Sequence, residues 1–170
     1  MVMGAHYVHT APIHENVGSN WNWIEALIAS VPIAILVMLI VWINQFQDAP
    51  SDAAVGKNTW VVRTAEKGEW MKLEKPLRLY KQFMIEAFVA VALVGALSFF
   101  TDFGTVYAFM ALIPLALVWK AFKMADEWMI KWNNPNADRQ KVPYELLLVN
   151  VSTIGIHFLT GILLAVAYIL

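Results

Sequence analysis

His157 is the residue whose chemistry is least expected from its surroundings. It lies in the last apolar run of the sequence, within the stretch "STIGIHFLTG" at positions 152–161. Ionisable side chains at membrane depth are rare and by default indicate function. We expect the imidazole to be neutral, because burial disfavours its charged form. The chemistries to weigh are a haem or quinone contact, a proton relay, and a hydrogen bond between helices.

The positions of the other histidines limit the haem hypothesis. His6, His9 and His14 all lie in the N-terminal tail, far from His157 in the sequence. A haem held within the membrane by two histidines of this chain is therefore excluded. A five-coordinate haem, or one shared with another subunit, is left open.

The tail histidines are themselves a candidate metal site. Their spacing is H-x2-H-x4-H, and Glu15 follows directly. Imidazole suits copper, zinc, iron and nickel, and copper is plausible on the oxidising outer side. However, the spacing fits no helix face, Pro12 interrupts it, and short histidine clusters are weak signals. The alternative is a strap across a partner's outer surface, with the histidines as ordinary polar residues.

The spacing around His157 favours packing over cofactor binding. Thr153, His157, Gly161 and Ala165 recur every four residues, so they share one helix face. Small and polar residues at this spacing are typical of close helix contacts in membranes. We therefore predict a hydrogen bond from His157 to a neighbouring helix, in this chain or another.

Two acidic residues also fall within apolar runs. Glu25 follows Asn22 at capping-box spacing, which predicts a helix start in the headgroup layer. Glu86 lies one turn inside the second run, at a depth similar to that of Asn150 in the last run. A Glu86–Asn150 hydrogen bond is a structural or interfacial interpretation, and proton or quinone chemistry at Glu86 is the alternative.

These residues must be positioned by membrane helices. The chain has 170 residues, of which 59% are hydrophobic and 15% are charged. Apolar runs of about 18 residues or more predict membrane spans, so we expect an all-α integral membrane protein of one domain. The predicted parts are an outer tail 1–22, spans 23–46, 83–100, 106–122 and 145–170, and inner loops 47–82 and 133–144, with the third span extended by an amphipathic segment to 132. There is no cysteine, which excludes disulfides and thiolate chemistry.

The basic residues predict the direction of the spans. Of the twelve Lys and Arg residues, seven lie in the loop between the first and second spans, and five lie between Trp119 and Tyr144, at the end of the third span and in the segment that follows it. Because cytoplasmic loops carry the excess of Lys and Arg, we expect a multi-pass plasma-membrane protein with both termini outside.

The first inner loop contains two short β-prone runs. They are "NTWVVRT" and "EWMKL", and Gly68 between them supplies the freedom that a hairpin turn needs. The sequence therefore predicts a small β-hairpin. Trp60 and Trp70 would pack on the other loop or a partner, or would lie on the lipid headgroups.

No sequence motif for catalysis by the isolated chain is present. We expect a non-catalytic structural or assembly subunit of a membrane complex, whose partners are other integral membrane subunits and lipid, and not nucleic acid. A redox complex, such as a terminal oxidase or a copper membrane monooxygenase, is the expected setting. The alternatives are a haem- or quinone-interacting electron-transfer subunit using His157, and a small transporter or proton-conducting protein. We expect no cofactor in the isolated chain, apart from copper at the tail or a shared haem.

Overall fold

The fold is a bundle of long apolar helices. The computed structural model describes residues 23–68, 70–101 and 104–170, and this part of the chain is all-α. Its elements are α2 (Trp23–Ala54), α3 (Trp60–Thr64), α4 (Glu74–Leu97), the 3₁₀ helix η1 (Val106–Leu112), α5 (Leu115–Trp132), η2 (Val142–Leu146) and α6 (Leu147–Ala167). Four segments are long and apolar enough to cross a membrane, namely Ala26–Ala54, Glu74–Leu97, Val106–Trp132 and Val142–Ala167. The chain is therefore a multi-pass membrane protein.

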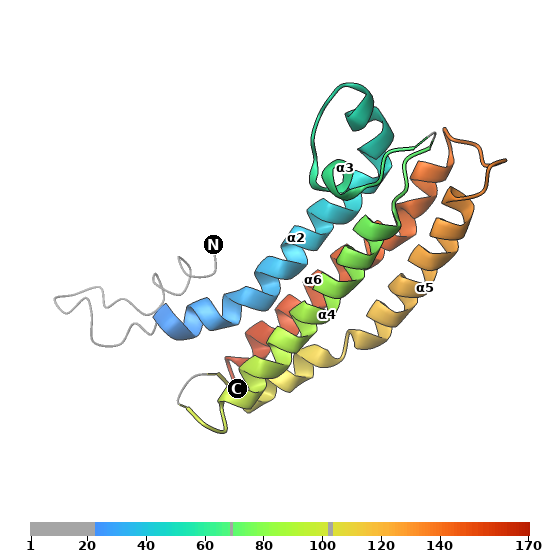
Figure 1. Ribbon diagram of the computed structural model, residues 1–170. Coiled ribbons are helices and arrows are strands. Elements are labelled where there is room, and N and C mark those ends of the chain that lie inside the picture. The colour runs from blue at the N-terminus through green and yellow to red at the C-terminus, as the bar shows by residue number, and fades with distance from the viewer. Residues whose placement is uncertain (1–22, 69, 102–103) are drawn as a thin grey trace.

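The connections divide between the two ends of the bundle. The segment that carries α3 and the connection between α5 and η2 lie at one end, which we call the basic end (residues 55–73 and 133–146) (Figure 1). The C-terminus and the connection between α4 and η1 lie at the opposite end (Figure 1). Both connections of the basic end are rich in Lys and Arg. Four spans are expected to bring these two connections to the same end of the bundle, so the arrangement of the helices agrees with the prediction.

The helices extend beyond the apolar runs that predicted them. The first continues past Phe46 to Ala54, and the second begins at Glu74 instead of Phe83. The added turns are polar or charged, and Lys, Arg, Gln and Leu are good helix formers. A hydropathy pattern locates only the membrane-buried part of a helix, so it predicts these turns as part of the inner loop.

The third span is not one continuous α-helix. The 3₁₀ helix η1 ends at Leu112, and α5 begins at Leu115, directly after its N-cap Pro114. Proline has no N–H to donate and its ring obstructs the preceding turn, so an α-helix rarely continues through it. At Pro114 the third span therefore changes from a 3₁₀ helix to an α-helix.

Two glycines allow the third span to approach α4 closely. A Cβ at Gly95 would lie 2.9 Å from Cζ of Phe109 in η1. Gly104 has a φ of 87°, and a Cβ there would lie 2.3 Å from the Val94 carbonyl oxygen. Both contacts are too short for a side chain, so the packing of η1 on α4 depends on glycine at these positions.

The predicted β-hairpin is wrong for its first strand. Residues Trp60–Thr64 form the helix α3, whose N-cap Thr59 accepts a hydrogen bond from the Val62 N–H. Gln45 of α2 also accepts a hydrogen bond from Val61, at 3.3 Å. These side-chain acceptors satisfy N–H groups at the start of the helix. What remains of the hairpin is one antiparallel bridge, between Glu66 and Lys72.

Candidate functional site

The polar face of α6 is the main cluster of buried polar groups in the described structure. Asn150, Thr153 and Thr160 are buried on this helix, and His157 is half-buried. The apolar residues that share the face include Val149, Ile156 and Leu164. A polar row within a membrane bundle can hold helices together, bind a ligand or conduct protons, so its hydrogen bonds decide what it can do.

The stripe predicted from the sequence overlaps this face only in part. Thr153 is fully buried, and His157 and Gly161 are half-buried. A Cβ at Gly161 would lie 3.8 Å from Ile33 of α2, which is ordinary packing distance. Ala165 is exposed and does not belong to the buried face. A role of this edge in contacts with another chain stays a prediction.

A hydroxyl pair joins α4 to α6. The Tyr80 hydroxyl lies 2.6 Å from Thr153 Oγ1, and both side chains are fully buried. The Thr153 hydroxyl has one hydrogen, which it donates to the Val149 carbonyl at 2.8 Å. Tyr80 is therefore the donor of the pair. This chain of bonds satisfies both hydroxyls and supports a packing role.

The structure gives Glu86 and Asn150 different partners from the predicted pair. The Asn150 amide nitrogen donates to Asn44 Oδ1 of α2 at 2.8 Å, while its own Oδ1 is buried without a partner among the described residues. Glu86 is exposed on α4 and accepts a hydrogen bond from Gln82, one turn earlier, at 2.8 Å. The Glu86–Asn150 hydrogen bond is therefore wrong, because Glu86 lies on the outer face of α4.

Among the described residues, the His157 imidazole lacks a hydrogen-bond partner at one of its two nitrogens. Its Nδ1 is buried and has no hydrogen-bond partner in the described part of the chain. The neighbouring Thr160 hydroxyl, on the same helix, is likewise without one. Together with Asn150 Oδ1, these are the buried polar side-chain atoms of α6 that lack a hydrogen-bond partner among the described residues. Such atoms are uncommon and costly.

The other predicted ligands lie outside what the structure describes. His6, His9 and His14 belong to residues 1–22, and the side chain of Glu25 is also outside the described set. Among the described residues, no group of three or more His, Asp or Glu side chains could hold a metal ion. The copper hypothesis for the tail stays a prediction.

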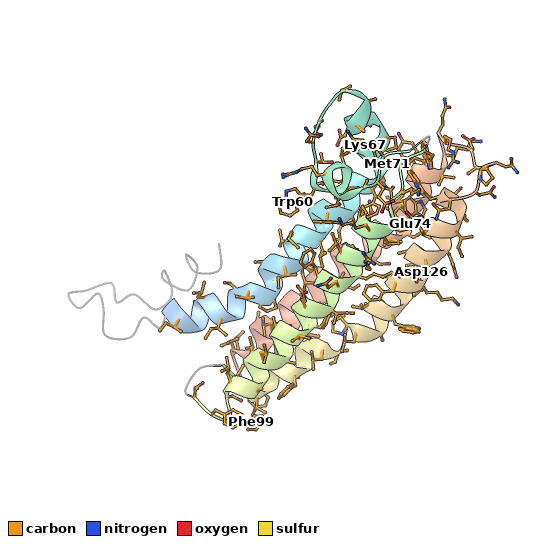
Figure 2. The ribbon with its side chains drawn as sticks, in the orientation of Figure 1. Trp60, Lys67, Met71, Glu74, Phe99 and Asp126 are labelled. Carbon is orange, nitrogen blue, oxygen red and sulfur yellow. The ribbon has the colours of Figure 1, made fainter. Side chains whose placement is uncertain are left out.

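The basic end is closed by stacked tryptophans. Trp132 lies between Trp70, at 4.6 Å, and Trp128, at 5.1 Å between ring centroids. The Arg139 guanidinium covers the Trp70 ring at 4.4 Å and donates to the Trp132 carbonyl. The Trp132 indole N–H donates to Met71, one of the residues labelled at this end in Figure 2. Trp70 thus packs on the end of α5 and on Arg139 of the other loop, while its contact with a partner or with lipid headgroups stays a prediction.

Sequence reasoning missed Tyr80 and Asn44, which bind the polar face of α6. Tyr80 lies in the charged stretch before the predicted second span, so the sequence places it in a loop. Asn44 lies near the end of the first span, where polar residues are common and do not indicate a buried contact. In comparisons with known proteins, no family model, no curated protein and no solved structure matches this chain. Function is therefore argued from the residues themselves.

Proposed function

We propose that this protein is a non-catalytic structural subunit of a multi-subunit membrane complex. The observation that carries the proposal is the position of Glu86. Its carboxylate lies within an apolar span, on the exposed face of α4, and accepts a hydrogen bond from Gln82. An ionisable group facing lipid is costly, and a neighbouring subunit that donates hydrogen bonds would remove that cost.

The interior of the bundle supports a structural role over a transport role. The buried Tyr80–Thr153 pair and the Asn44–Asn150 amide pair each join two helices. The Trp42 indole also donates to the Pro76 carbonyl, which connects α2 to α4. Bonds of this kind fix helix positions, whereas a carrier needs polar groups that face a cavity and bind a solute.

The orientation and the setting complete the proposal. The excess of Lys and Arg in the two connecting loops favours a cytoplasmic basic end, with both termini outside in the plasma membrane. A redox complex is the setting we propose, on the basis of the histidine-bearing tail, with copper there or a haem shared with another subunit. Its partners would be other integral membrane subunits.

A second candidate, a haem- or quinone-interacting electron-transfer subunit, is favoured by His157 alone. Its Nδ1 is buried without a partner among the described residues, so it could accept a bond from a ligand or a ligand's protein. A visible spectrum of the purified complex tests this candidate. A haem band that disappears in His157→Leu, with normal assembly, would favour it over the structural role.

Co-purification in mild detergent tests the main proposal. We expect the wild-type chain to retain partner subunits and Glu86→Leu to lose them by about tenfold or more, because a hydrogen bond to a charged group contributes roughly 1.5–3 kcal/mol. Glu86→Gln keeps an acceptor and should retain an intermediate amount. Val89→Leu, one turn away on another exposed position of α4, is the matched control.

Photocrosslinking locates the contact. A photoreactive residue at position 86 should give crosslinks to a distinct membrane protein, whereas the same residue at exposed Phe158 of α6 reports a different face. A stable monomer that crosslinks only to lipid from position 86 would contradict the proposal.

A further inference from the structure

A groove runs between α4 and one face of α5 near the basic end. Its volume is about 400 Å³, and it is lined by Lys81, Trp119, Phe122, Lys123, Asp126, Glu127 and Ile130. The α5 residues recur every three or four positions, so they share one helix face. Figure 2 labels Asp126 on α5, and its side chain is exposed. Aromatic side chains thus adjoin charged ones where the apolar part of the third span ends.

The groove lining carries two cations and two anions, and one of each is already paired. Lys81 forms an ion pair with Asp126, and its ammonium lies 5.5 Å from the centroid of the Phe122 ring. Lys123 and Glu127 are exposed and have no ion-pair partner in the described part of the chain. Residues four apart on a helix have Cβ atoms about 5–6 Å apart. The groove therefore presents one free cation and one free anion side by side.

We propose that this groove binds a phospholipid with a phosphoethanolamine headgroup. Lys123 would bind the phosphate, and Glu127 would accept hydrogen bonds from the ammonium. The phosphate and ammonium of this headgroup are joined by two carbons, a separation that suits neighbouring side chains on one helix face. Trp119 and Phe122 would contact the upper part of an acyl chain.

The order of the charges along α5 matches the order of groups in the lipid. Lys123 precedes Glu127 in a helix that leaves the membrane, so it lies about 6 Å nearer the bilayer centre. In a phospholipid the phosphate is likewise nearer the acyl chains than the ammonium. An anionic glycerol headgroup offers Glu127 only neutral hydroxyls and no cation, and a choline headgroup has a cation but no N–H to donate. The groove should therefore select phosphoethanolamine over both.

Native mass spectrometry of the delipidated full chain tests this selectivity. Phosphatidylethanolamine, phosphatidylglycerol and phosphatidylcholine of identical acyl chains are added separately at equal concentration. We expect the wild-type chain to retain the ethanolamine lipid about two- to fivefold better than the other two, because only the Glu127–ammonium contact differs between the lipids and one exposed charge contact contributes up to about 1 kcal/mol. Glu127→Gln should remove this preference, and Lys123→Gln should weaken all three lipids.

A charge swap separates an oriented site from simple charge balance. The double variant Lys123→Glu/Glu127→Lys keeps the net charge but reverses the order, so it should lose the ethanolamine preference. Lys120→Gln changes an exposed α5 lysine outside the groove lining and should leave the preference intact. Equal retention of the three lipids by the wild-type chain would overturn the proposal. So would an ethanolamine preference that survives in the double variant, or one that Lys120→Gln removes.

Discussion

Tyr80 donates a hydrogen bond to Thr153 across the α4–α6 interface, with an oxygen–oxygen distance of 2.6 Å between two fully buried side chains. Because Thr153 donates in turn to Val149, the pair is directional. The two partners therefore cannot be removed at equal cost.

Tyr80→Phe should destabilise the bundle less than Thr153→Val does. The first variant leaves the Thr153 hydroxyl bonded to Val149 and should cost about 0.5–1.5 kcal/mol. The second leaves the Tyr80 hydroxyl buried without its acceptor and should cost about 1–3 kcal/mol. Unfolding in detergent with increasing SDS measures both. A double variant no less stable than Thr153→Val would confirm the coupling, and strictly additive losses would contradict it.

Gly95→Ala should loosen the packing of η1 on α4. The new Cβ would meet the Phe109 ring at 2.9–3.0 Å, so the ring or the helix must move. Overpacking of this kind costs about 1–3 kcal/mol. Gly155→Ala on α6 is the matched control, because a Cβ there meets nothing within 4 Å. The control should be neutral or stabilising by up to about 1 kcal/mol, and an equal loss in both variants would contradict the close approach.

Arg139→Lys should open the tryptophan stack without unfolding the membrane helices. A lysine cannot reproduce the flat guanidinium over Trp70 together with the hydrogen bond to the Trp132 carbonyl. We expect faster proteolysis of residues 64–73, with thermal unfolding of the bundle little changed. Lys141→Ala removes an exposed charge from the same connection and serves as the control. Equal cleavage of the two variants would mean that Arg139 is not what holds the stack.

His157→Leu should change the stability of the isolated chain by less than about 1 kcal/mol. The Nδ1 atom has no partner among the described residues, so the substitution breaks no described bond there and replaces a buried polar atom with an apolar one. In the assembled complex we expect a larger loss of assembly or thermal stability than of turnover per complex. A large destabilisation of the isolated chain would point to an intrachain bond instead.

The connection between α5 and η2 should respond to acid through Asp138. The Gln140 N–H donates to this carboxylate, and the nearby Lys141 adds to the effect, so both hold the pKa of Asp138 below its usual value. The carboxylate stabilises the turn at pH above its ordinary pKa of about 4. That contribution is lost as the pH falls through the lowered value in the folded state. The NMR shift of the Gln140 amide should follow this titration, and Asp138→Asn should abolish it.

The positions of the helices could be predicted where apolar composition decides structure. The side-chain contacts between the helices could not. Long runs such as residues 147–167 must be helical in lipid, because every backbone polar group has to be satisfied within the segment. The polar turns from Glu74 to Gln82 carry no such signal, and with them Tyr80 was lost from the predicted core. The residues Trp60–Thr64 have strand propensity, but the side chains of Thr59 and Gln45 accept N–H bonds and favour a helix turn. The sequence places Glu86 within an apolar segment, but the direction of its side chain depends on how α4 is rotated against its neighbours.

The helix type of η1 sets the length of the third span. A 3₁₀ helix rises about 2.0 Å per residue and an α-helix about 1.5 Å, so the seven residues of η1 extend about 3–4 Å further than α-helical turns would. Conversion of this segment to an α-helix would shorten the span by that amount. Mismatch with the bilayer costs fractions of a kcal/mol per Å, so the segment before Pro114 makes the protein's stability sensitive to membrane thickness.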